Sequence, residues 1–384
     1  MLRFSSAGES HGRAMVAVVE GLPAGVPITA AEINRELARR QLGHGRGGRM
    51  QIERDAVQVL SGVRFGESIG SPIALLVANK DWENWLDAMA TEPAADRPEP
   101  VAAPRPGHAD LAGVWKTGRS DIRDILERAS ARETVARVAA GAVAKSLIGE
   151  FAIAVGSRVV SIGEVGMDPR FLEEPIDSEA LDDTPVRCPD PVASEKMVEA
   201  IDRARMDGDT LGGTFEVQAA GVIPGLGGYD LPRSRLDGRI AGSVMSIPSV
   251  KGVEVGEGFA LAAARGSEAH DEIVTDEMGR IVRPTNRAGG LEGGVTNGEP
   301  LRIRAAVKPV PTLAKPLRSV DLVTGEPVEA LRERSDVCVV PAAAVVAEAA
   351  VAFELAVALV EKFGGDSLVD MRAAAERYLK RIGR

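Results

Sequence analysis

The chain has few of the residues that build metal sites and disulfide frameworks. Only two cysteines, Cys188 and Cys338, occur in 384 residues, which excludes a disulfide-stabilised scaffold and indicates a reducing compartment. The four histidines lie far apart, without cysteines at zinc-ligand spacing and without an HExxH motif. We therefore expect no metal site.

Export and membrane signals are also lacking. The N-terminal MLRFSSAGESHG has no apolar signal core, and the longest apolar run, residues 341–360, is interrupted by Glu348 and Glu354. Lipid-facing helices rarely carry such carboxylates. We expect a buried helix there, in a cytoplasmic protein with no membrane partner.

Positive charge is in deficit, and lysine is scarce. The chain has 46 Lys and Arg against 56 Asp and Glu, a net charge of −10, which argues against nucleic acid as a partner. Only 9 of the 46 basic residues are lysines, so 37 are arginines. Either a GC-rich genome or a need for planar anion-binding groups would explain this excess.

The remaining composition is that of a globular chain rich in loops, with 45% apolar residues, 42 glycines and 23 prolines. Helix caps and apolar periodicity predict helices, and alternation predicts strands. The expected helices are 29–43, 130–149, 194–206 and 341–363, and the expected strands are 57–63, 73–77, 215–222, 250–255 and 301–307.

These elements alternate without a regular βαβ rhythm, which predicts a mixed α/β or α+β body and not a doubly wound sheet or an eightfold barrel. No linker divides the chain, so we expect a single domain over residues 1–384. The proline-rich residues 91–106 are expected to form a long loop, and residues 366–384 a C-terminal tail helix.

Residues 35–54 form a locally basic segment in this acidic chain. It contains Arg35, Arg39, Arg40, Arg46, Arg49 and Arg54, with glycines at 43, 45, 47 and 48. The segment is either a solvated helix end with a flexible loop or an anion site, because glycines allow close backbone approach and arginines bind phosphate or carboxylate bidentately. Its GHGRGG matches GxGxxG, but a helix precedes it and a strand follows, the reverse of a dinucleotide site.

Other candidate residues lie in short turns. Residues 128–133 (RASARE) are either a helix cap or a second anion site at a helix N-terminus. His11 and His108 lie in glycine-flanked turns, which suit proton transfer but are also common on surfaces. Ser10 precedes His11 without a GxSxG elbow, so a hydrolase triad is not supported. Asp336 pairs with Arg334, helps to organise the entry to the helix at Pro341, or accepts a proton near a ligand.

Taken together, the motifs resemble the chorismate synthase family. They are GESHG, RxxxGHGRGGRM followed by ERD, RPGHADL, RxSARET, VKGVExG, GGLEGG, KPxxT and RSDVC followed by a helix that begins with proline, in order from residue 1 to about 365. The resemblance implies one large mixed α/β domain with helices sandwiched between antiparallel-rich sheets. It further implies a homotetrameric lyase of the shikimate pathway that converts 5-enolpyruvylshikimate 3-phosphate into chorismate and phosphate with reduced FMN.

The resemblance also implies residue roles. His11 would protonate or hydrogen-bond the departing phosphate, and His108 would stabilise the anionic reduced flavin near its N1 and O2 side. Asp336 with Ser10 would help to remove the proton from the flavin N5. The residues implied in substrate binding are Arg40, Arg46, Arg49, Arg105, Ser130 and Arg132. Those implied in flavin binding are Arg128, Ala129, Ser130, Pro248, Ser249, Gly293, Lys308, Pro309, Val310, Pro311, Thr312 and Arg334.

Three of these positions depart from the common family pattern. Ala129 stands where serine is usual, Pro248-Ser249 replaces an amide-Ala pair, and Pro311 occupies a position that is often Ser or Thr. A hydroxyl bond to flavin at 129 or 311 is therefore lost, whereas backbone contacts would survive. No reductase module is recognisable, which favours an external flavin reductase, and an NADPH site at Arg40 and Arg46 stays open.

Two other functions compete with this one. The GHGRGG segment could serve a pyridine-nucleotide oxidoreductase that works without flavin, in which case NADPH oxidation would accompany substrate change. Alternatively, the arginines could bind RNA or an acidic partner with steep salt dependence, an interpretation that the net charge disfavours.

Overall fold

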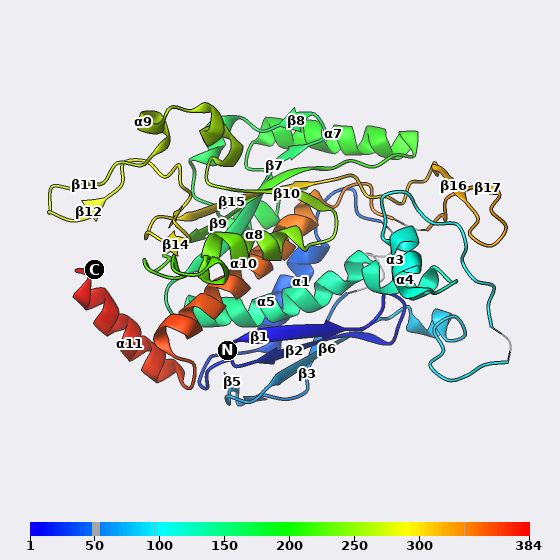
Figure 1. Cartoon of the computed structure of the whole chain (residues 1–384), viewed down its shortest axis with the longest axis horizontal. Helices are drawn as coiled ribbons and strands as arrows, with labels where there is room; N and C mark the ends of the chain where they lie inside the picture. The colour runs from blue at the N-terminus through cyan, green and yellow to red at the C-terminus, as the bar shows by residue number, and fades with distance from the viewer. Residues whose placement is uncertain (48–53, 96, 334) are drawn as a thin grey trace.

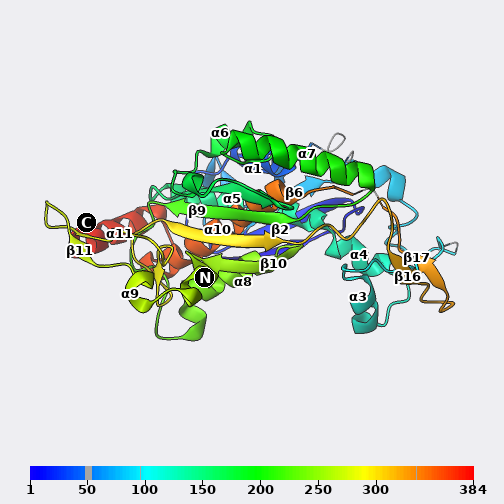
Figure 2. The same ribbon diagram turned by 90° about the horizontal axis from the view of Figure 1, so that it is seen from above.

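The computed structural model describes residues 1–47, 54–95, 97–333 and 335–384. Two antiparallel sheets enclose a layer of helices, as Figures 1 and 2 show. The smaller sheet has the strand order β1 (Arg3–Ala7), β2 (Ala14–Glu20), β6 (Ile73–Ala78) and β3 (Val57–Val59). The larger sheet has the order β10 (Val250–Val255), β15 (Leu301–Val307), β9 (Gly213–Ala220), β7 (Ala154–Ile162) and β8 (Val165–Gly166).

The helices between the sheets form the core. They are α1 (Ala30–Gln41), α5 (Thr134–Gly149), α8 (Leu236–Met245) and α10 (Val340–Phe363). Helix α5 packs on β2 and β6 of the smaller sheet, α10 packs on β7 and β9 of the larger one, and the two helices pack on each other. Gly141 allows this close crossing, because a Cβ there would clash with the Cβ of Ala349.

Helix α10 explains the long apolar run of the sequence. Its mean hydropathy is 2.2 over the most apolar window, long and apolar enough for a membrane span, but 94% of that window is buried inside the protein. It is therefore a core helix, as its two interrupting glutamates predicted.

The remaining elements surround this sandwich. Helix α7 (Pro191–Asp207) contacts β7 and β8, and α11 (Leu368–Arg381) packs on the end of α10. Helices α3 (Asp110–Thr117) and α4 (Arg123–Ala129) pack together at one end. The short elements are α6 (Ser178–Asp182), α9 (Gly266–Ala269) and the ladders β4 (Val63–Arg64) with β5 (Glu67–Ser68), β11 (Val274–Thr275) with β12 (Ile281–Val282), β13 (Leu291–Glu292) with β14 (Val295–Thr296), and β16 (Arg318–Val320) with β17 (Pro327–Glu329).

The mixed α/β architecture predicted from the sequence is confirmed. Thr29 caps α1 by accepting a hydrogen bond from the Glu32 N–H at 3.2 Å, which is the N-cap half of the capping box that the sequence indicated. The Glu32 side chain accepts from the Thr29 hydroxyl at 2.9 Å. Two predictions need correction. The expected strand 57–63 is broken after Val59, and the expected helix at 130 begins with a 3-10 turn over 131–133, because Ser130 caps the N–H of Arg132.

Candidate active site

The candidate residues gather where the ends of several elements meet. Helix α1 ends there, α5 begins there, and the turn between β1 and β2 reaches α4. Figures 1 and 2 place α3, α4 and the β16–β17 hairpin at this same end of the molecule. The contacts described next link these segments into one site.

A buried carboxylate holds His11 in the turn between β1 and β2. The imidazole Nδ1 is 2.9 Å from Oε1 and 3.1 Å from Oε2 of Glu127 on α4, and Trp85 stacks on the ring with centroids 3.9 Å apart. Since a carboxylate only accepts, Nδ1 carries a hydrogen, and proton exchange with a ligand falls to Nε2. Burial opposes the charge of Glu127, but hydrogen bonds from His11 keep the pKa of Glu127 below its usual value.

Two serines and Arg128 lie next to this histidine. Ser130 Oγ is 3.2 Å from Ser10 Oγ, so the two hydroxyls lie side by side before α5. Arg128 donates to the carbonyl oxygens of Ser6 at 3.1 Å and Gly8 at 3.0 Å. Its guanidinium therefore ties the end of β1 to α4, where Ala129 is the last helical residue.

Two buried arginines share one carboxylate beneath this turn. Asp55 accepts from Arg40 Nη2 at 2.8 Å and from Arg132 Nη1 at 2.7 Å. Arg132 Nε also donates to Asn79, which in turn donates to the carbonyl oxygen of Gly12 at 2.6 Å. Burial lowers the pKa of Arg40 while Asp55 opposes this. With two guanidinium groups for one carboxylate, the cluster carries an excess positive charge that suits an anionic ligand.

His108 has a carboxylate partner of its own. Its Nδ1 is 2.5 Å from Oδ1 of Asp110, which is fully buried and also accepts from Arg105 Nε at 2.9 Å. Arg105 reaches further, to Thr312 Oγ1 and to Glu333 Oε2, both at 3.1 Å. Burial opposes the charge of Asp110, but hydrogen bonds from His108 and Arg105 hold the pKa of Asp110 well below its usual range.

A cavity of about 370 Å³ is lined by Arg46 and Asp336. Arg46 Nη1 is 2.8 Å from Asp336 Oδ2, and the Gly47 N–H donates to Oδ1 at 2.6 Å. Thr312 and Glu333 line the same cavity and also contact Arg105. Among the described residues, then, Asp336 pairs with Arg46. The alternative partner Arg334 lies outside the described residues, as does Arg49.

The residues implied in flavin binding are only partly brought together. The Lys308 N–H donates to the Ser249 carbonyl at 2.9 Å, and Lys308 Nζ donates to the Gly107 carbonyl at 2.9 Å, next to His108. Pro311 Cβ also lies close to Gly107, so Ser249, Lys308 and Pro311 are on the His108 side. Pro248, Pro309 and Val310 are the sequence neighbours of these residues. Burial and the neighbouring Lys251 lower the pKa of Lys308. Two neighbouring ammonium groups that repel each other fit an anionic ligand such as a phosphate group.

Gly293 lies elsewhere. It is in the turn between β13 and β14, and this hairpin follows Gly289 and Gly290, which contact the start of β15. Lys308 follows the other end of that seven-residue strand, about 20 Å away at the rise of a β-strand. Within one described chain, Gly293 is therefore not placed with Lys308.

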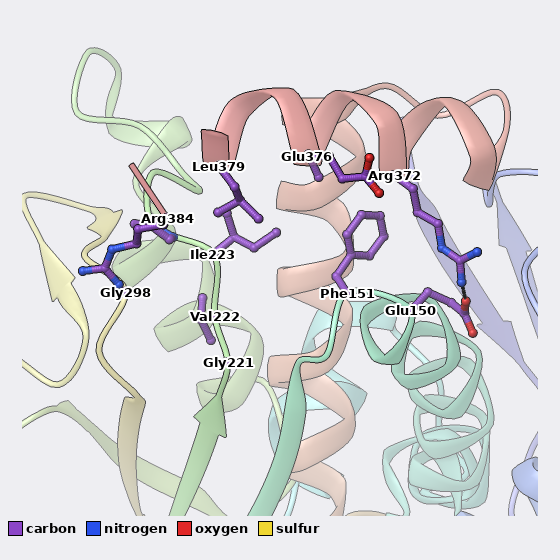
Figure 3. Close-up of a pocket in the computed structure, with 12 residues that line it drawn as sticks. Glu150, Phe151, Gly221, Val222, Ile223, Gly298, Arg372, Glu376, Leu379 and Arg384 are labelled. Carbon is purple, nitrogen blue, oxygen red and sulfur yellow. Dashed lines mark hydrogen bonds and ion pairs between the residues drawn. The ribbon is translucent and has the colours of Figure 1, made fainter. Parts of the chain in front are cut away.

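The larger cavity, about 650 Å³, is a different place. Figure 3 shows it under α11, with Phe151 and Ile223 on its walls. Arg372 points to Glu150, with which it pairs, whereas Arg384 points away from both. Its arginines do not converge, and none of the residues implied by the resemblance lines it, whereas Arg46, Thr312 and Asp336 line the smaller cavity. The end of the molecule that carries His11 and His108 is therefore the better candidate despite its smaller cavity.

Sequence reasoning missed the groups that hold the predicted residues: Glu127, Asp110, Asp55, Asn79 and Trp85. Asp110 follows His108 by two residues within RPGHAD, and this spacing could have revealed it. The other four come from remote positions in the sequence, so only the fold brings them together.

Comparisons with known proteins identify the family of this chain. The family model described as chorismate synthase matches residues 2–360. The chorismate synthase of Moorella thermoacetica is 58% identical over 388 residues, all of both chains, and that of Desulforudis audaxviator is 56% identical over 385 residues, covering 100% of this chain and 98% of the relative. A crystal structure of chorismate synthase superposes with a TM-score of 0.80 at 41% identity, covering 99% of this chain and 98% of that one. The chain therefore belongs to the chorismate synthase family, lyases of the shikimate pathway that act on a small-molecule substrate and lead to the aromatic amino acids.

Proposed function

We propose that the elimination of phosphate from 5-enolpyruvylshikimate 3-phosphate takes place between His11, His108 and the arginines of this site. The observation that carries the proposal is the buried, positively charged Arg40–Asp55–Arg132 cluster beside a carboxylate-bound histidine. The substrate carries one phosphate and two carboxylates, and converging guanidinium groups orient such a ligand.

His11 acts on the leaving group in this proposal. Its protonated ring donates from Nε2 to a phosphate oxygen as the carbon–oxygen bond at C3 breaks, which offsets the charge that develops there. Ser10 and Ser130, whose hydroxyls lie 3.2 Å apart, donate further hydrogen bonds and fix the ligand's orientation.

The arginines bind the remaining charges. Arg40 and Arg132 face the ligand from the buried cluster, while Arg46 and Arg105 do so from the sides of Asp336 and His108. Arg40 Nε is buried without a hydrogen-bond partner in the described part of the chain, which leaves one donor for a ligand. Arg49 belongs to this set by resemblance.

Reduced FMN is the proposed cofactor, and when bound it lends electron density to the substrate and takes it back. Lys308, Thr312 and the turn at Ser249 are the described residues that would hold it, with Arg128, Ser130 and, by resemblance, Arg334. His108 would stabilise negative charge on the cofactor, and Asp336 would accept a proton with the help of Ser10. Gly293 joins this set only if another protomer supplies it.

The wider setting is also proposed. We infer a homotetramer in the cytoplasm that receives reduced flavin from an external reductase, with the whole chain acting as one domain. NADPH, if it is used as a source of reducing equivalents, would bind near Arg40 and Arg46.

Anaerobic phosphate release tests the proposal. The purified protein is mixed with substrate and chemically reduced FMN, with and without NADPH, and phosphate and chorismate are measured together with flavin binding. Wild-type protein is expected to release phosphate without NADPH, and His11→Ala to lower turnover by roughly 10²- to 10⁴-fold, the range for a positioned proton donor.

A control variant separates the two cavities. Arg372 lines the larger cavity and is paired with Glu150, as His11 is paired with Glu127 in the candidate site. Arg372→Gln should leave turnover within about twofold of wild type. No phosphate above background from the wild-type protein would refute the proposed activity. Equal losses in Arg372→Gln and His11→Ala would refute the location of the site.

A further inference from the structure

Glu127 makes three polar contacts with the turn that carries His11. Its backbone carbonyl accepts the Ser10 N–H at 2.9 Å. Its side-chain Oε2 accepts the His11 N–H at 2.8 Å, and Oε1 lies 2.9 Å from His11 Nδ1. One residue of α4 thus fixes both the backbone and the ring of His11, although the sequence motifs gave Glu127 no role.

In the contact between His11 and Glu127 the imidazole is the hydrogen-bond donor and the carboxylate the acceptor. Of the two neutral imidazole tautomers, only the one with hydrogen on Nδ1 can donate to a carboxylate. Glu127 therefore selects that tautomer, which presents Nε2 to the ligand.

Two neighbours keep this geometry in place. Arg123 Nη1 donates to Glu127 Oε1 at 2.9 Å and its guanidinium lies over the Trp85 ring, 5.0 Å from the centroid. Trp85 in turn stacks on the imidazole. Histidine, carboxylate, guanidinium and indole thus form a closed ring of contacts that restrains rotation of the His11 side chain.

We propose that Glu127 is a positioning residue for catalysis, holding His11 in the Nδ1–H form so that Nε2 delivers a proton to the leaving phosphate. The inference rests on the proposed role of His11. Glu127 stays ionised throughout and Nδ1 keeps its hydrogen, while the Nε2 proton passes to the phosphate and leaves a neutral imidazole.

A purely structural role is the competing explanation, because Glu127 also forms an i,i+4 ion pair with Arg123. The chain offers a matched control for this role. Glu133 is likewise buried and forms the same i,i+4 pair with Arg137, with a nitrogen–oxygen distance of 2.7 Å. No described contact joins Glu133 to His11.

The first test reads the histidine without turnover. Protein labelled with ¹⁵N in histidine is compared as wild type, Glu127→Ala, Glu127→Gln and Glu133→Ala, with the His11 signals assigned by their loss in His11→Ala. Neutral His11 is expected as the Nδ1–H tautomer in wild type, in Glu133→Ala and in Glu127→Gln, which keeps an acceptor oxygen. In Glu127→Ala the population should shift toward the Nε2–H tautomer.

The second test is a double-mutant cycle on phosphate release. Glu127→Ala should lower kcat roughly 10- to 100-fold, the usual effect of removing a group that orients a histidine, with Glu127→Gln lower by less and Glu133→Ala within about twofold of wild type. In the His11→Ala background, Glu127→Ala should change kcat by no more than about twofold, because the residue acts through the ring. Circular dichroism identifies any variant that fails to fold. If Glu127→Ala does not fold, Glu127→Gln replaces it in this kinetic cycle, in which its smaller loss of kcat should likewise vanish in the His11→Ala background.

The two tests fail in different ways. A retained Nδ1–H tautomer in Glu127→Ala would overturn the positioning role while leaving that of His11 intact. The positioning role would also be overturned if the kcat losses of Glu127→Ala and His11→Ala multiplied in the double variant, because Glu127 would then act independently of the His11 ring. Unchanged kcat in His11→Ala would instead refute the role of His11, and the catalytic part of this inference with it.

Discussion

Glu348 lies in the middle of α10, and replacing it with glutamine is a strong test of how the fold supports the site. Its carboxylate is fully buried and accepts from Arg39 Nη1 at 2.7 Å, Lys145 Nζ at 2.6 Å and Ser157 Oγ at 2.6 Å, with Arg187 Nη2 at 3.3 Å. Glutamine keeps the volume and removes the charge on which these cations converge. Breaking one side of a buried ion pair costs about 3–5 kcal/mol.

This cost translates into a measurable melting shift. At about 2.1 cal/mol/K per residue, a chain of 384 residues unfolds with an entropy of roughly 0.8 kcal/mol/K, so Glu348→Gln should lower Tm by about 4–6 °C at pH 7. Scanning calorimetry of the ligand-free protein measures it. Glu329→Gln, which breaks an exposed pair with Arg332, should shift Tm by about 1 °C or less. A Glu348→Gln protein that melts within 1 °C of wild type would refute the reasoning.

Three further results are expected. Burial opposes the charge of Glu348, but its cationic partners hold its pKa well below the usual value, so its stabilisation is complete above about pH 4.3 and is lost as the pH falls. The Tm gap between wild type and Glu348→Gln should therefore narrow below that pH, and a constant gap would contradict this. Gly141→Ala should lower Tm by roughly 1–4 °C, since overpacking against Ala349 costs about 1–3 kcal/mol, and an unchanged calorimetric Tm would show that the α5–α10 crossing relaxes. Asp110→Asn should lower turnover roughly 10- to 100-fold by loosening His108, with unchanged circular dichroism, and full phosphate release would argue against it.

Local signals in the sequence predicted helices α1, α5, α7, α10 and α11, whereas α3, α4 and α8 were not predicted. The Thr29 cap and the apolar spacing of α1 depend on residues within a few positions of one another, and the structure has both. The strands at 250–255 and 301–307 were found with their exact bounds because a half-buried strand alternates every second residue.

Strands β1 and β2 were not predicted, for different reasons. β1 is the short, polar edge RFSSA, whose strand character comes from pairing with β2 and not from its own side chains. β2 alternates in burial, but its mixture of small and branched residues was not recognised as a strand. The pairing of β2 with β6 and of β9 with β15 joins residues far apart in the chain, which no local pattern encodes.

In the candidate site, the sequence indicated the hydrogen-bond donors but not the carboxylates that hold them. Histidines and clustered arginines are uncommon enough to attract notice, whereas Glu127 and Asp55 are two among 56 acidic residues, most of which face solvent in any protein. Their roles follow from burial and from partners on other elements, and both properties exist only once the chain has folded.

The arginines of the candidate site explain why arginine and not lysine occupies these positions. They also explain how the proposed site in an acidic protein accommodates a trianionic substrate. Arg40 and Arg132 share Asp55, and Arg46 is paired with Asp336, so the structure does not hold a bare patch of positive charge. A guanidinium has five N–H donors and a carboxylate occupies at most two of them, so each arginine can stay folded against its partner and still donate to a ligand. A lysine ammonium paired in the same way would offer fewer donors and no fixed plane. Genome composition explains neither the pairing nor the burial at these positions. By contrast, Arg39, the immediate neighbour of Arg40 on α1, is committed to the Glu348 network, which anchors the helix end that presents Arg40 to the site.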